Sequence, residues 1–271
     1  MNRFPFNARL IIALTVVCLG VSSMVASPFG LAQEGGAKPQ TESALTRKNG
    51  KQNQKSAPSA EKLPDPVTQD ILGWTVFVDP AMLKGEHAEG GAKALKMLES
   101  HLFFITLLVP EQRLAELKTL KIWIEHQHPT MTNMAYHPSG SWLVKNGHDP
   151  RLEKMVHIPV ASQLLNHQQL MKHPMVVMHE LAHSYHDQFL GFNDKRVLAT
   201  FKSAKSSGRY ESVLDHRGEK VRHYALNNHK EYFAESTEAY FNRNDFYPFV
   251  NGELKEFDPD MHALMKEIWG F

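Results

Sequence analysis

The sequence predicts an α+β domain in which a small mixed sheet packs on helices and a buried helix precedes a largely helical C-terminal part. Three observations carry this prediction. β-rich stretches occur at residues 74–78, 121–127 and 156–160, and segments with helical spacing separate the first two. Residues 174–190 are apolar over most of a helix circumference. Beyond this segment most of the pattern is helical.

The N-terminal half of the domain is expected to alternate between strands and helices. Residues 74–78 have the alternation of a strand, and residues 121–127 are rich in β-branched and aromatic side chains. Between them, residues 88–108 and 111–120 have helical spacing, so a helical crossover is expected to pack on the sheet. Residues 131–144 are dense in Tyr, His, Pro, Gly and Ser, which predicts turns and a hairpin.

One long helix is expected over residues 174–190, after a short helix or loop at 161–167. Pro174 suits the first turn of a helix, where its missing N–H costs nothing, and Gly191 is a natural terminator. Because apolar side chains cover most of its circumference, this helix is expected inside the domain.

The remaining C-terminal part is predicted to be mostly helical. A helical stretch to about residue 206 precedes a possible hairpin at 215–218 and a helix at about 230–242. A last helix begins with Asp258 as its N-cap and ends at Gly270.

Residues 1–32 are typical of a secretory signal peptide. Arg3 and Arg9 precede an apolar run over residues 10–26 that is short for a membrane span. Cleavage after Ala32 satisfies the small-residue rule, and a cut after Ala26, with the bulkier Met24 upstream, is the alternative cleavage site. An uncleaved N-terminal anchor is the alternative. The protein is therefore expected to be secreted or periplasmic, with no stable membrane span after cleavage.

Residues 33–63 have the composition of a disordered linker or propeptide, with almost no aromatic or β-branched side chains. Residues 1–63 carry 8 Lys and Arg against 3 Asp and Glu, whereas residues 64–271 carry 22 against 26. The predicted domain, 64–271, therefore has no basic stripe, which argues against binding of nucleic acid. Cys18 lies in the apolar run and is the only cysteine, so the mature domain is expected to fold without disulfides.

The most informative motif is the run His179-Glu180-Leu181-Ala182-His183. Residues i and i+4 of a helix lie one above the other, so His179 and His183 can present two imidazole nitrogens to one Zn²⁺. Glu180 can then take a proton from the water that the metal activates. The motif predicts zinc-dependent hydrolysis, and a polar helix face without metal is the alternative for the pentapeptide alone.

A third metal ligand is expected from a second acidic helix, which contains Glu231-Tyr232-Phe233-Ala234-Glu235. Glu231 and Glu235 share a helix face, so one can bind zinc while the other accepts the Nδ1–H of a ligand histidine. Glu238 also falls near that face and could substitute for either, although a solvated or capping role is expected. His186 lies a turn beyond His183 and is expected to support the ligands, to face substrate, or to be solvated.

These spacings resemble the gluzincin pattern, and most closely that of the anthrax lethal factor and Pro-Pro endopeptidase group of secreted metallopeptidases. The second motif of that group reads Glu-Phe/Tyr-Phe-Ala-Glu, and a Tyr stands seven residues before it, as Tyr224 stands seven before Glu231. The resemblance covers residues 170–241. This chain departs from it in Ala182, where lethal factor has Gly, and in extra polar loop residues before Glu231, which leave substrate specificity open.

The resemblance implies a zincin-like metallopeptidase domain in which His179, His183 and Glu231 hold Zn²⁺. It implies that Glu180 is the general base and that Tyr224 stabilises the oxyanion. The expected partner is a peptide or protein substrate, cleaved by endopeptidase activity. Oligomeric state is not indicated by the sequence.

Two other functions stay open. One is a secreted zinc-binding protein of zincin fold with little turnover, although every catalytic position is filled. The other is an amidase that acts on cell-wall peptide, although nothing resembles a wall-binding repeat.

Where substrate lies is a further expectation. Zincins commonly bind substrate along a sheet edge, and the strand at 156–160 is one candidate for that edge, with a buried core strand as the equal alternative. A polar-aromatic cluster precedes this strand and either lines a cleft or is a scattered surface loop: Tyr136, His137, Ser139, Trp142 and His148.

Overall fold

The computed structural model describes residues 62–270, which fold around a five-stranded sheet and two apolar clusters. The predicted signal peptide and all but the last two residues of the predicted linker, 33–63, lie outside the described residues. Leu63 belongs to the folded domain, because its side chain is 3% exposed and its backbone N–H donates to Asp149 Oδ2 at 3.0 Å. The domain therefore includes at least one residue that the composition assigned to the linker.

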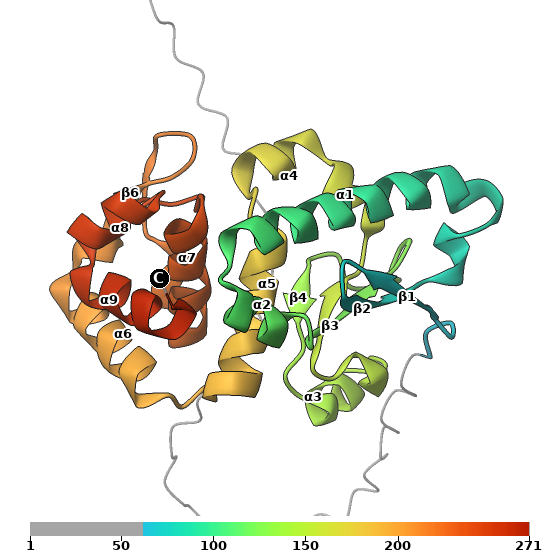
Figure 1. The fold of residues 1–271 in the computed structure, drawn as a ribbon, viewed down its shortest axis with the longest axis horizontal. Coiled ribbons are helices and arrows are strands. Elements are labelled where there is room, and N and C mark those ends of the chain that lie inside the picture. The colour runs from blue at the N-terminus through green and yellow to red at the C-terminus, as the bar shows by residue number, and fades with distance from the viewer. Residues whose placement is uncertain (1–61, 271) are drawn as a thin grey trace, which may run out of the picture. The chain divides into compact units, whose positions relative to one another are not determined.

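The sheet is built from strands β1 (Val67–Ile71), β2 (Trp74–Val78), β3 (Lys121–Ile124), β4 (Ala135–Tyr136) and β5 (Met155–Ile158). Their order is β1-β2-β3-β5-β4 (Figure 1). β2, β3 and β5 are parallel, whereas β1 pairs antiparallel with β2 and β4 with β5. The predicted α+β class with a small mixed sheet is thus confirmed.

Strand β1 is an element that the sequence pattern did not predict. Three of its five residues are polar, and all of them are exposed or half-buried, as an edge strand permits. Leu72 and Gly73 connect it to β2, and both have positive φ, at 55° and 93°. Positive φ at both central residues is typical of the type I′ turn, whose twist matches that of the two strands.

Helix α1 (Ala88–Leu108), predicted with the same bounds, packs on one face of the sheet, and the short α2 (Glu111–Leu117) follows it (Figure 1). Gly91 allows a close approach at its start, because a Cβ there would lie 2.1 Å from the carbonyl oxygen of Met82. The main apolar core joins this helix to the sheet and includes Val76, Leu98, Leu102, Ile122 and Val156.

The opposite face of the sheet is covered by α3 (Gly140–Lys145). A second apolar cluster lies there, made of Leu63, Trp123, Leu143 and Leu152. The sequence predicted only turns and a hairpin over residues 131–144. The helix forms because Ser139 caps it, accepting from the backbone N–H of Trp142 at 3.2 Å.

The predicted helix at 174–190 is observed as α5 (Val176–Tyr185), which continues into a π-helical turn (His186–Leu190). It ends at Gly191, whose φ of 80° is the left-handed conformation that favours glycine. The short α4 (His167–Lys172) precedes it. Every residue of α5 except His183 is buried, so the helix lies in the interior as expected.

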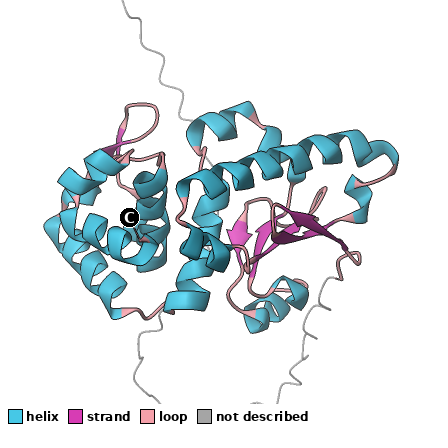
Figure 2. Ribbon diagram, in the orientation of Figure 1, coloured by secondary structure: helices cyan, strands magenta, loops and turns pink. Residues whose placement is uncertain are grey.

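The C-terminal part is helical apart from one small hairpin, β6 (Val213–Leu214) with β7 (Lys220–Val221) (Figure 2). Its helices are α6 (Lys195–Ser207), α7 (His229–Phe241), α8 (Asn251–Phe257) and α9 (Pro259–Trp269). Among residues 62–270, no helix combines the length and apolar character needed to cross a bilayer. Helix α7 packs on α5, and this contact positions the candidate site.

Candidate metal centre

Two buried helices bring the motif residues together. α5 carries the His-Glu-x-x-His motif, α7 carries the acidic residues, and the two helices are in contact. α7 is buried from Tyr232 to Tyr240. Asn228 fixes its start by accepting from the backbone N–H groups of Lys230 and Glu231 at 2.9 and 3.0 Å. This cap places Glu231 in the first turn, beside the histidines of α5.

Three donor atoms converge between these helices. Glu231 Oε2 lies 3.2 Å from His179 Nε2 and 3.2 Å from His183 Nε2, and the two nitrogens are 3.1 Å apart. On a tetrahedral zinc with bonds of about 2.0–2.1 Å, neighbouring donors are about 3.3 Å apart. The set of two imidazole nitrogens and one carboxylate oxygen therefore fits Zn²⁺ in both chemistry and spacing.

Hydrogen bonding fixes which nitrogen of His179 is available. Its Nδ1 lies 2.6 Å from Glu238 Oε1, so Nδ1 carries a proton and donates it. In the neutral ring the Nε2 lone pair then faces the carboxylate of Glu231, an arrangement that is repulsive unless a cation or a proton lies between them. Such a ring is prepared to bind a metal through Nε2.

The charges around the three donors also favour a cation. Burial acts to lower the pKa of His179, but hydrogen bonds to Glu231 and Glu238 outweigh it and raise that pKa well above its usual value. Burial acts to raise the pKa of Glu231, but the charges and hydrogen bonds of His183 and His179 hold it well below the usual range. The site therefore keeps Glu231 ionised and attracts positive charge.

Glu180 is held beside the donors by the sheet. It is 7% exposed, and its Oε2 accepts from the backbone N–H of Tyr136 in β4 at 2.8 Å. Burial raises its pKa, while the charges of His179 and His183 act to lower it. A carboxylate with a raised pKa, held in one position, has the properties of a general base.

Tyr224 opens a short 3-10 turn (Tyr224–Asn227) that packs against α7. Its side chain is 44% exposed, so it is accessible to a ligand beside the buried donors. Partial burial and the charge of Glu231 raise its pKa to about 12. The hydroxyl is therefore protonated at neutral pH and can donate a hydrogen bond.

The carboxylate that accepts a hydrogen bond from His179 Nδ1 is Glu238, not Glu235 as predicted. Glu235 lies 3.9 Å from His179 Nδ1, too far for a hydrogen bond, whereas Glu238 lies at 2.6 Å. Glu238 is one heptad after Glu231, so it is displaced only about 20° around the helix and reaches back towards the N-terminus. The solvated or capping role expected for Glu238 is wrong, because it is 0% exposed.

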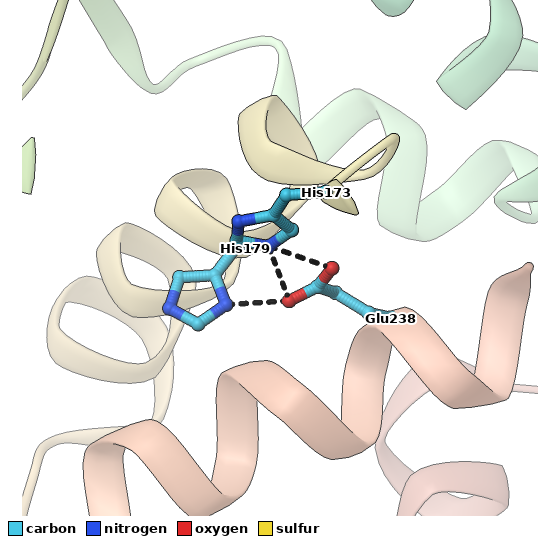
Figure 3. A group of neighbouring side chains, drawn as sticks. All are labelled: His173, His179 and Glu238. Atoms are coloured by element: carbon cyan, nitrogen blue, oxygen red, sulfur yellow. Dashed lines mark hydrogen bonds and ion pairs between the residues drawn. The ribbon is translucent and has the colours of Figure 1, made fainter. Parts of the chain in front are cut away.

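His173 joins the same network, and Figure 3 shows both imidazole rings in contact with the carboxylate of Glu238. His173 Nε2 lies 2.9 Å from Glu238 Oε1. The two histidines and Glu238 place donor atoms within 4.8 Å of one another, so this is a second group that could hold a metal ion. Sequence reasoning missed His173, whose one local signal is its position directly before Pro174.

His186 is in none of the three environments expected from the sequence. It is 0% exposed, and its ring packs against Phe233, Phe192 and His229, with centroid separations of 4.7, 5.2 and 5.8 Å. Among the described residues neither ring nitrogen has a hydrogen-bond partner. Burial lowers its pKa to about 3, so it is a neutral side chain of the core.

Of the two roles expected for the strand at 156–160, the structure bears out the buried core strand and not the sheet edge. β5 lies between β3 and β4, so it is a core strand, and β4 is the outer strand on this side of the described sheet. The polar-aromatic cluster does not line one cleft. Tyr136 Oη donates to Asp187 Oδ2 at 2.6 Å, whereas His137 pairs with His157 on another strand and Ser139 caps α3.

Comparisons of this chain with protein-family models, with curated proteins and with solved structures found no match. What the arrangement can do follows from its chemistry. Three donors that fit one divalent metal ion, a buried carboxylate beside them and a protonated phenol near the same charges are the groups that metal-assisted hydrolysis requires.

Proposed function

We propose that this chain is a zinc-dependent endopeptidase with a zincin-like domain. The observation that carries the proposal is the convergence of His179 Nε2, His183 Nε2 and Glu231 Oε2 to within 3.1–3.2 Å of one another. These atoms come from two helices and lie up to 52 residues apart in the sequence. The resemblance in motif spacing and the geometry point to the same three ligands.

Each residue has a distinct role in the proposed reaction. When bound, Zn²⁺ supplies the Lewis acid that polarises a carbonyl and lowers the pKa of water. Glu180 accepts the proton of the attacking water and passes it to the amine as the C–N bond breaks. Tyr224 donates a hydrogen bond to the carbonyl oxygen as negative charge develops there.

The outer edge of β4 supports a peptide as the substrate. The backbone of the next residue, His137, faces β5: its N–H donates to Met155 O at 3.1 Å, and its carbonyl oxygen accepts from the N–H of Lys154 at 2.7 Å. Tyr136 therefore points its N–H outward, and that N–H binds Glu180. The outer edge of β4 thus borders the proposed base, and an extended peptide bound along this edge would lie beside Glu180. We further propose, from the predicted signal peptide, that the enzyme acts outside the cytoplasm.

The decisive experiment compares wild type with Glu180→Gln. We expect the variant to retain about one zinc per chain, since Glu180 is not a ligand, and to lose cleavage of a peptide library. Glu256→Gln, an exposed substitution on α8, is the matched control and should cleave as wild type does. Full activity of Glu180→Gln would contradict the proposal.

The same assay separates the other functions. Wild type that binds zinc and cleaves neither peptides nor peptidoglycan would indicate a zinc-binding protein without turnover. Release of cell-wall peptide without cleavage of the library would indicate an amidase. Either result would overturn the endopeptidase assignment.

A further inference from the structure

His173 lies outside both sequence motifs, in the link between α4 and α5. Pro174 follows it, and a proline disfavours helical conformation in the residue before it. His173 accordingly leaves the helix, with φ −132° and ψ 68°. Its imidazole therefore contacts α7 and not the surface of α4, and it hydrogen-bonds to Glu238.

The contacts between His173 and Glu238 are short and buried. His173 Nε2 lies 2.9 Å from both carboxylate oxygens of Glu238. His179 Nδ1 lies 2.6 Å from Oε1 of the same carboxylate. The two rings are nearly perpendicular, at 85° with centroids 5.3 Å apart, so they approach Glu238 from different directions (Figure 3).

Glu238 depends on these two imidazoles. Its side chain is 0% exposed, so water does not stabilise its charge, and a buried carboxylate needs N–H donors. Among the described residues, its side-chain hydrogen bonds are those to His173 and His179. Two donors hold the carboxylate in one orientation, and that orientation directs the Nδ1–H of His179 towards it and the Nε2 lone pair away from it.

We infer that His173 is a positioning residue for the metal centre: through Glu238 it fixes the orientation and tautomer of His179. The inference rests on the proposed function, because it assigns the Nε2 of His179 to the metal. It predicts that His173 controls zinc affinity although it does not bind zinc itself.

His173, Glu238 and His179 fit a chain of hydrogen bonds better than they fit a second metal ion. Two donors on one tetrahedral zinc are about 3.3 Å apart, since zinc bonds are about 2.0–2.1 Å long. The separation of 2.6 Å between His179 Nδ1 and Glu238 Oε1 is shorter and is that of a charge-assisted hydrogen bond. A metal on Nδ1 would also require removal of the proton that this hydrogen bond uses.

The test is the zinc dissociation constant, measured by competition with a chromophoric chelator. Substitution of such a supporting residue typically weakens metal binding about 10- to 100-fold, and we expect this range for His173→Phe and for Glu238→Gln. His173→Gln should retain most of the affinity, because its amide N–H can still donate to Glu238. The double variant should be little weaker than either single variant, because both residues act through one chain of contacts.

Two controls match these variants. Glu235→Gln changes a buried carboxylate on the same helix that lies 3.9 Å from His179 Nδ1, and it should leave zinc affinity near that of wild type. His167→Gln changes an exposed histidine at the start of α4 and should also have no effect.

Four results would overturn the inference, and they are distinguishable. Wild-type affinity in a folded His173→Phe variant would remove the role of His173 and leave the proposed function intact. Two zinc ions per wild-type chain, with one lost in His173→Phe, would make His173 a ligand. A wild-type chain without zinc affinity would overturn the proposed function itself. If His173→Phe does not fold, undiminished zinc affinity in Glu238→Gln would show that His173 does not act on His179 through Glu238.

Discussion

His179 is the residue on which the candidate site depends most. One ring nitrogen faces Glu231 and the other donates to Glu238, so the imidazole lies between two carboxylates. An aliphatic side chain could fill the same space but would remove one partner from each carboxylate, leaving Glu231 with His183 and Glu238 with His173. The chemistry of this one side chain thus links the proposed ligands to the buried carboxylate behind them.

Tyr224 allows the proposed catalysis to be tested apart from the proposed metal binding. Its hydroxyl is protonated at neutral pH because its pKa is raised to about 12. We expect Tyr224→Phe to lower kcat/KM about 100- to 1000-fold, the typical effect of losing one oxyanion donor, and to leave the zinc content unchanged. Steady-state kinetics on a cleaved library peptide, with metal analysis of the same sample, checks this. Unchanged kcat/KM would remove Tyr224 from the mechanism.

At the scale of elements, α1 and the strands β2, β3 and β5 were predictable from their patterns, whereas β1, β4 and α3 were not. The 21-residue α1 has the predicted bounds, since its apolar side chains recur with helical spacing over six turns. β4 has two residues, too few for any period to appear, yet it supplies the N–H that holds Glu180. Its position is set by pairing with β5 and by the bond from Tyr136 to Asp187, which are tertiary contacts.

The π-helical turn after α5 contains a group whose protonation opposes folding. His186 is fully buried there, and burial lowers its pKa to about 3. In the unfolded chain its pKa is about 6.5, so between these values the unfolded state binds more protons. The contribution of neutral, buried His186 to the free energy of unfolding is therefore complete above about pH 6.5. Below that pH it decreases by about 1.4 kcal/mol per pH unit.

His186→Phe should remove this pH dependence, because phenylalanine fits among the surrounding aromatic rings and does not titrate. We expect the free energy of unfolding of the variant to fall about 2–3 kcal/mol less than that of wild type between pH 7.5 and 4.5. Urea unfolding of metal-free protein at both pH values measures the difference. Parallel pH dependence in the two proteins would show that His186 is not held neutral by burial.

At the scale of the whole molecule, local signals predicted the candidate ligands better than their surroundings. His179, His183 and Glu231 follow from helical spacing and from a motif resemblance, and the structure brings their donor atoms together. Glu235 and Glu238 both lie near the face of Glu231, so helical spacing alone does not decide which one meets His179. That choice depends on how α7 packs against α5, and the sequence does not contain this angle in any local pattern.

The central claim is that one zinc ion binds among His179, His183 and Glu231. Crystals of the zinc-loaded protein, measured on both sides of the zinc absorption edge, test it most directly. The account predicts one anomalous peak, about 2.0–2.2 Å from His179 Nε2, His183 Nε2 and Glu231 Oε2. A peak beside His173 and Glu238 instead, or no ordered zinc between α5 and α7, would contradict it.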